Sequence, residues 1–208
     1  MHLFYRSVFL FLLLTSGGFF LGTPQAICQV VVESRVDSTV NNYKSFLRSG
    51  YAQFFGGEIV EIKASSSQET EGRYNYEATN LIKNNFAAVW MEGVEGYGIG
   101  ESLQLTFTKL TTDDKRTFNK QFYCVNGYAF NPSVWSDYAR VKAFKVYKTT
   151  APDEQEIVML ADSPFLQTFE LSFTLQEGDI LVFEILDVYV GNKYDDTCLS
   201  MLAPVCLP

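Results

Sequence analysis

The chain has 208 residues, a formal net charge of −8 and one histidine, His2. The length fits one domain behind a short leader, and the acidity argues against nucleic acid and anionic membranes as partners, because both recruit lysine and arginine patches. A mature chain without His2 has no imidazole, which excludes serine–histidine–aspartate and cysteine–histidine catalysis and histidine-rich metal sites.

Residues 1–28 have the pattern of a signal peptide. An apolar run from Ser7 to Phe20 follows a cationic residue, and Ala26 and Cys28 place small residues at −3 and −1 for cleavage before Gln29. A membrane anchor is the alternative, but the run is short and is interrupted by Ser-Gly-Gly. Lipoprotein processing at Cys28 fits the preceding residues poorly. We expect a secreted, periplasmic or cell-surface chain with no membrane span after cleavage.

Residues 29–57 are expected to form an N-terminal arm or a short helix. Val36, Val40, Tyr43 and Leu47 recur at helical spacing, and glycines follow them. The pattern fits a helix packed on the domain and a loosely held arm equally well.

Residues 58–208 are predicted to form an all-β domain, since the apolar period there changes to two. The clearest alternation ends at Leu175, and the turn residues Gln176–Asp179 follow it as a predicted hairpin connection. Predicted strands cover residues 58–64, 102–108, 118–125, 141–147, 156–160, 167–175 and 179–189. Seven or eight short strands with little helix predict an antiparallel β-sandwich.

Residues 89–107 combine a glycine-rich, acidic and aromatic loop with an alternating strand. Its four glycines permit turns that other residues disfavour, and loops on a rigid sandwich are where binding sites tend to lie. Trp90 opens a buried segment, so the core is a more natural place for it than a sugar-stacking surface.

Three carboxylates of this loop, Glu92, Glu95 and Glu101, invite comparison with the paired acids of glycoside hydrolases. A catalytic pair also needs a deep cleft, which a compact sandwich lacks. We therefore expect Glu101 to hydrogen-bond loop amides and Glu92 to meet Arg140 or Lys142, and no enzymatic activity.

Three cysteines remain after cleavage before residue 29: Cys124, Cys198 and Cys206. An odd number in an oxidising compartment suggests one bridge and one free thiol. Cys198 and Cys206 are close in sequence and are the predicted pair, whereas Cys124 lies in a strand pattern typical of a buried, inert thiol.

Several motifs occur in a characteristic order: WMEGVEGYGIGE at residues 90–101, then Asn126-Gly127-Tyr128, Arg140-Val141-Lys142 and Asp195-Asp196-Thr197-Cys198. With them, residues 58–203 resemble the discoidin-like (coagulation factor type C) domain of the NADase-translocation type. That family is named after the non-catalytic segment that precedes a secreted bacterial NAD glycohydrolase. The resemblance implies a galactose-binding-like jelly roll that binds glycans or proteins through loops at one end, and it does not imply NAD hydrolysis.

Two departures from the family pattern concern calcium. Asn84-Asn85 and Ser200-Met201-Leu202 stand where related domains often carry acidic residues that help to hold a structural ion. Amide oxygens and backbone carbonyls alone are a poor ligand set for calcium. We therefore expect no tightly bound calcium, no other metal and no cofactor.

The candidate binding residues are aromatic and hydrogen-bonding side chains of the predicted loops. Aromatic rings offer platforms for sugars, while the amide, guanidinium and carboxylate groups suit polyols or a sugar acid. Two of these candidates also have a purely structural interpretation. The Asp-Asp pair could be a solvated turn, and Arg140 could be a partner of Glu92. The sequence favours a carbohydrate-binding module, with a protein-interaction or translocation-assisting domain as the alternative; the candidates are Glu92, Tyr97, Asn126, Tyr128, Trp135, Arg140, Asp195 and Asp196.

Overall fold

The computed structural model describes residues 29–207 except 73, 84, 109–116 and 131. The predicted signal peptide, residues 1–28, and Asn84 of the calcium argument lie outside the described part. Among the residues that the structure describes, no helix is long and apolar enough to cross a bilayer.

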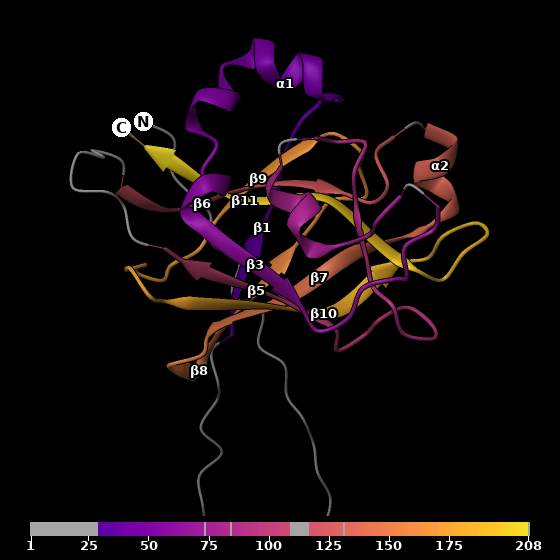
Figure 1. Ribbon diagram of the computed structural model, residues 1–208. Coiled ribbons are helices and arrows are strands. Elements are labelled where there is room, and N and C mark those ends of the chain that lie inside the picture. The colour runs from indigo at the N-terminus through magenta and orange to yellow at the C-terminus, as the bar shows by residue number, and fades with distance from the viewer. Residues whose placement is uncertain (1–28, 73, 84, 109–116, 131, 208) are drawn as a thin grey trace, which may run out of the picture.

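Two layers of strands pack face to face (Figure 1). Both layers belong to one open sheet of 11 strands, and they are joined where β11 pairs in parallel with β7 at Thr197 and Cys198. The predicted β-sandwich is thus confirmed. One layer contains β2 (Arg35–Asp37), β9 (Leu166–Glu170), β6 (Thr117–Asn126), β11 (Thr197–Leu207) and β4 (Trp90–Met91); the other contains β1 (Val30–Glu33), β8 (Ala151–Met159), β7 (Ala139–Lys148), β10 (Ile180–Tyr189), β5 (Ser102–Phe107) and β3 (Val60–Ala64).

Aromatic rings from both layers form the centre of the core. Phe122 on β6 stacks on Phe169 of β9 with ring centroids 5.5 Å apart, and it meets Phe183 of β10 edge-on, also at 5.5 Å. Phe144 of β7 packs edge-on against Phe183 at 5.7 Å. Such offset and edge-on contacts are the favoured aromatic geometries, and they hold the two layers in register.

The N-terminal segment contains a helix, α1 (Tyr43–Ser49), on the outer face of β6, β9 and β11 (Figure 1). Asn42 caps its start and Gly50, with φ of 86°, ends it. The helix packs on the sheet through Phe46, whose ring lies 5.8 Å from that of Tyr123. The predicted face was therefore wrong: Leu47 is 50% exposed, whereas Phe46 is fully buried.

Four shorter helical turns connect the strands: η1 (Tyr51–Phe54), η2 (Gly57–Ile59), η3 (Ala78–Ile82) and α2 (Pro132–Asp137). Before α1, the arm contributes two strands that the sequence did not predict. β1 pairs in parallel with β8, and β2 pairs antiparallel with β9.

The predicted turn at residues 176–179 is present, with Gly178 at φ of 84° and Asp179 N–H donating to the Gln176 carbonyl at 3.1 Å. The connection is not a hairpin, because β9 pairs with β2 and β6 while β10 pairs with β5 and β7. Strand β9 ends at Glu170. The alternately buried residues 171–175 then carry the chain from one layer to the other.

The predicted Cys198–Cys206 disulfide is wrong. Both residues lie on β11, eight positions apart, and a strand rises about 3.3 Å per residue, so their Cα atoms are separated by roughly 25 Å. A disulfide requires about 4.4 to 6.8 Å between Cα atoms. Cys124 is a free, fully buried cysteine, as predicted, and Cys198 is also free and fully buried.

Cys124 and Cys198 are expected to resist thiol reagents in the native protein. Burial raises the pKa of both thiols, and Asp196 and Glu92 raise that of Cys198 further. Since the thiolate is the reactive form, alkylation should reach these two positions only after denaturation. Mass spectrometry of peptides from native and denatured protein measures this, and native labelling of Cys124 would contradict the packing described.

Candidate functional site

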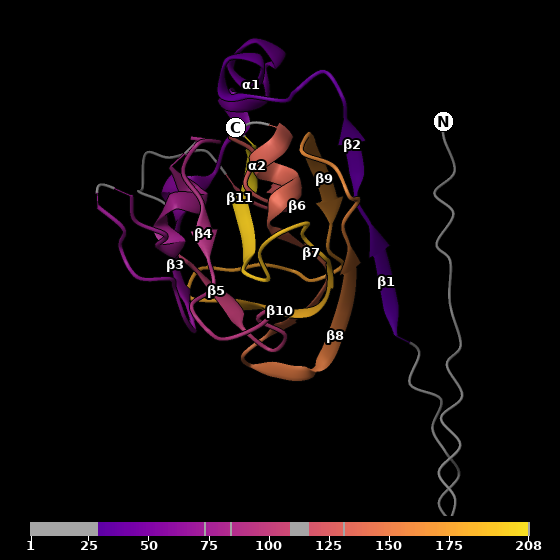
Figure 2. The same ribbon diagram turned by 90° about the vertical axis from the view of Figure 1, so that its right-hand side faces the viewer.

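Three loop segments gather at one end of the sandwich, on the right of Figure 1 and facing the viewer in Figure 2. They are the loop of residues 92–101, the α2 segment of residues 127–138, and the loop of residues 190–196, and together they are called the loop end. The amides of Lys193 and Tyr194 donate to the Asp137 carbonyl at 3.0 and 2.9 Å. The 190–196 loop is thereby fixed to the end of α2.

Arg140 is buried beneath this end, with only 6% of its surface exposed. Its Nε and Nη2 donate to the carboxylate of Asp162 at 2.9 to 3.0 Å, and its Nη1 donates to the carbonyls of Tyr138 and Val190 at 2.9 and 3.1 Å. The guanidinium also lies 4.6 Å from the ring centroid of Trp135. Arg140 does not pair with Glu92, and its guanidinium has no exposed face with which to bind a sugar acid. Its role is therefore structural rather than either of the two predicted ones.

Asn126 and Trp135 also stabilise the loops rather than face solvent. The Asn126 amide donates to the Val141 carbonyl at 2.6 Å and accepts from the Val141 amide at 3.1 Å. The indole Nε1 of Trp135 donates to the Asn126 carbonyl at 2.9 Å. Trp135 is half-buried, and its indole N–H and the Arg140 side of its ring are engaged. Trp135 is thus only partly open to solvent, and the predicted platform is not fully exposed.

Tyrosines also form a partly exposed aromatic surface at this end. Tyr138 stacks on Tyr194 with ring centroids 4.6 Å apart and planes 28° from parallel, and Tyr128 lies 5.6 Å from Tyr138. Tyr194 is 46% exposed. Burial raises the pKa of both Tyr128 and Tyr138. The rings of Tyr128, Tyr138 and Tyr194 are called the tyrosine cluster.

The two aspartates adjoin the tyrosine cluster. Asp195 is exposed and Asp196 is half-buried. Burial, followed by the neighbouring charge of Asp195, raises the pKa of Asp196. Their backbone is fixed because the Asp196 carbonyl accepts from the Ala139 amide at 3.1 Å. Two carboxylates and an exposed ring therefore share one rigid turn.

Glu92 is fully buried and holds the glycine-rich loop together. Its two carboxylate oxygens accept from the amides of Val94 and Thr197 at 2.9 and 3.1 Å. Burial raises its pKa, and these two amide donors oppose that shift. The predicted pairing of Glu92 with Arg140 or Lys142 is wrong, since Lys142 pairs with Asp187 at 2.6 Å.

Tyr97, from the same loop, is exposed, and its carbonyl accepts from the Thr197 hydroxyl at 2.8 Å. Glu101 accepts from the Ser65 hydroxyl rather than from loop amides. Trp90 is fully buried, as expected, with its indole N–H on the Ser66 carbonyl at 3.0 Å. The structure therefore brings all the candidates to one end, buries Glu92, Asn126 and Arg140, and leaves Tyr97, Tyr128, Trp135, Asp195 and Asp196 partly or fully accessible.

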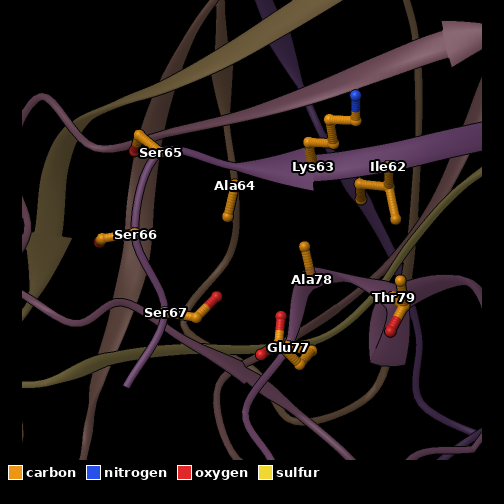
Figure 3. A pocket seen from close by; sticks show the side chains of 9 residues that line it. All are labelled: Ile62, Lys63, Ala64, Ser65, Ser66, Ser67, Glu77, Ala78 and Thr79. Carbon is orange, nitrogen blue, oxygen red and sulfur yellow. The ribbon is translucent and has the colours of Figure 1, made fainter. Parts of the chain in front are cut away.

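A shallow pocket of about 390 Å³, with a mixed polar and apolar lining, lies between β3 and η3. Figure 3 shows the side chains of Ser67 and Glu77 on one side of it and those of Ile62 and Lys63 on the other. None of the sequence-predicted residues lines it. Within the described part of the chain, no group of three His, Cys, Asp or Glu side chains could hold a metal ion.

Sequence reasoning missed one feature of this end, the partly exposed stack of Tyr138 on Tyr194. The two residues are 56 positions apart, and nothing in either local pattern indicates that they touch. The only available signal was position in the sequence: Tyr138 lies two residues before Arg140, and Tyr194 directly precedes Asp195.

Comparison with known proteins gives one family match. The model of the NAD glycohydrolase translocation F5/8 type C domain matches residues 53–203. No curated protein sequence matches the chain.

Several solved structures share the fold. The CBM32-1 and CBM32-2 domains of Clostridium perfringens ZmpB, in complex with GalNAc, match at a TM-score of 0.55 and 11% identity, over 85% of this chain and 39% of that one. The family 32 module of C. perfringens NanJ, in complex with galactose, matches at a TM-score of 0.45 and 11% identity, over 74% of this chain and 97% of that one. At such identity the ZmpB likeness shows the fold alone, a discoidin-like β-sandwich.

Proposed function

Because the chain belongs to the NAD glycohydrolase translocation F5/8 type C domain family, we propose that it is a secreted, non-catalytic module that binds carbohydrate at its loop end. In this proposal residues 1–28 are removed as a signal peptide, residues 29–57 form an arm, and residues 58–208 form the binding domain. The ZmpB domains were solved in complex with GalNAc, which supports a sugar as ligand.

The observation that carries the proposal is the stacked pair Tyr138–Tyr194 beside Asp195 and Asp196. A ring half open to solvent offers a flat apolar surface for the C–H face of a sugar. Carboxylates one and two residues away can accept hydrogen bonds from its hydroxyls. The backbone that carries the stack is held by Arg140 and Asp137, so these groups are in place before a ligand arrives.

A glycan array tests the proposal, followed by calorimetry with the best glycan. Tyr194→Ala should weaken binding about tenfold, which corresponds to about 1.4 kcal/mol, while leaving the thermal midpoint nearly unchanged because the ring is exposed. Tyr147→Ala is the matched control, since Tyr147 is a half-buried tyrosine near the opposite end of β7. Glycan binding that survives in Tyr194→Ala would place the site elsewhere.

Binding is also expected to depend on pH through Asp196. Its pKa is raised by burial and by Asp195, and only the ionised carboxylate offers all its lone pairs to sugar hydroxyls. Affinity should therefore fall as the pH decreases through this raised pKa and stay flat in Asp196→Asn. Calorimetric titrations across the acidic range measure this. A pH-independent affinity in the unmodified protein would exclude Asp196 from the site.

A protein partner is the second candidate, and a specific observation favours it. Val94, Tyr97 and Ile99 expose apolar surface on the 92–101 loop, which a soluble protein otherwise tends to cover. Ile99→Asp should then abolish capture of the partner and leave glycan binding intact. The reverse result, lost glycan binding with Ile99→Asp, would merge this loop with the sugar site.

A further inference from the structure

We propose that the first part of the N-terminal segment, residues 30–37 and from here on called the arm, helps to order the loop end, and that Ser34 is its positioning residue. The arm lies outside the segment that matches the family model, residues 53–203. In this inference the arm fixes a loop of residues 160–165, called the Asp162 loop. Through that loop it fixes the ion pair between Asp162 and Arg140, which orders the tyrosine cluster. The expected effect of the arm on ligand affinity rests on the proposed function, whereas its expected effect on the order of the Asp162 loop does not.

The arm joins the two layers of the sandwich at one edge (Figure 2). β1 pairs with β8 of one layer and β2 pairs with β9 of the other. Ser34 stands between β1 and β2, where its amide donates to the Met159 carbonyl at 2.9 Å. The Asp162 loop is the connection from β8 to β9, so the arm spans the two ends of that same loop.

Ser34 and Gln167 form a closed hydrogen-bond network with the Asp162 loop. The Ser34 hydroxyl donates to Gln167 Oε1 at 2.6 Å and accepts from the Ala161 amide at 3.1 Å. The Ala161 amide also reaches Gln167 Oε1 at 2.8 Å. Gln167 Nε2 donates to the carbonyls of Ala161 and Ser163 at 3.0 and 3.2 Å. The backbone on both sides of Asp162 is therefore fixed, and the arm contributes one of the side chains that fix it, beside Gln167, Asn126 and Tyr189.

From Asp162 the connection to the tyrosine cluster is direct. Its carboxylate takes three contacts from the guanidinium of Arg140. The remaining Arg140 nitrogen holds the carbonyls of Tyr138 and Val190, which begin or end the two segments that carry the stacked rings. An Asp162 that shifts would leave Arg140 free to turn, and both segments would lose their shared anchor.

A purely stabilising arm would change the whole protein evenly, so the test needs local readouts in the full chain. Ser34→Ala removes the hydroxyl, and Ser34→Thr restores it. Val36→Ala is the matched control, because Val36 lies on the same arm with an exposed side chain. Hydrogen exchange at residues 160–165 reports on the loop. Acrylamide quenching reports on Trp135, which lies on Arg140, with fully buried Trp90 as the unquenched internal reference.

Ser34→Ala is expected to speed exchange of the Ala161 amide about fivefold, the effect of losing one ordinary hydrogen bond, and to increase quenching of Trp135. Ser34→Thr should restore both values, and Val36→Ala should alter neither. Unchanged exchange and quenching in Ser34→Ala would overturn the inference, as would an increase in exchange spread evenly over all strands. If a glycan binds, Ser34→Ala should weaken it, with the thermal midpoint lowered only by the few degrees that one hydrogen bond contributes. If no glycan binds, the proposed function fails, and exchange and quenching still decide the role of the arm.

Discussion

Replacing Arg140 with methionine is expected to lower the free energy of unfolding by about 3 kcal/mol, because it breaks a largely buried ion pair and leaves two carbonyls without their charged donor. The side chain of Arg140 is buried, but that of Asp162 is partly exposed and can be rehydrated. The loss should therefore lie at the lower end of the range for buried pairs. Urea denaturation followed by circular dichroism measures it.

Lys142→Met is the control for this prediction. Lys142 lies two residues from Arg140 on the same strand and pairs with Asp187, but both side chains are well exposed. Exposed pairs contribute at most about 1 kcal/mol, so the control should unfold nearly as the unmodified protein does. Equal losses in the two variants would mean that the Arg140 network does not hold the loop end together.

The sequence predicted strands well where one face of the sheet meets the core and the other meets solvent. β5 is the simplest case, since Leu103, Leu105 and Phe107 are buried while Gln104 is exposed. β11 was missed because it is buried on both faces. Leu199 and Leu202 face the main core, whereas Met201 and Val205 lie under α1. A strand covered twice has no alternation to detect.

The sequence predicted that the candidate residues share one end of the sandwich more accurately than it predicted their contacts. Asn126, Trp135 and Arg140 do lie at the loop end, as the motif order implied. The polar groups of each, however, hydrogen-bond to backbone carbonyls, to a backbone amide or to Asp162. A polar residue type in a loop motif has the same sequence signature whether it recognises a ligand or holds the loop for others. Only the distances distinguish the two.

The wrong disulfide has a related cause. Spacing along the chain predicts proximity in a turn but distance along a strand, so the Cys198–Cys206 pairing depended on the strand that had been missed. The failure to predict β11 as a strand thus led directly to the wrong disulfide.

Gly127→Ala is expected to destabilise the fold by about 3 kcal/mol, through a left-handed backbone that costs a non-glycine residue about 1 to 2 kcal/mol and through overpacking. Gly127 has a φ of 75°. A Cβ atom there would lie 2.5 Å from Arg140 Cγ and 2.7 Å from Trp135 Nε1. The clash falls on the two side chains that order the loop end, so Trp135 emission should change together with stability.

Gly96→Ala separates the two contributions. Gly96 has a φ of 92°, but a Cβ atom there would meet nothing within 4 Å. Its substitution should cost only the backbone strain, about 1 to 2 kcal/mol, and leave the emission of Trp135 unchanged. The difference between the variants measures how tightly Arg140 and Trp135 pack on the Asn126–Gly127 turn. If the two alanine variants are equally stable, that packing is loose, and the tyrosine cluster cannot be held in advance of its ligand.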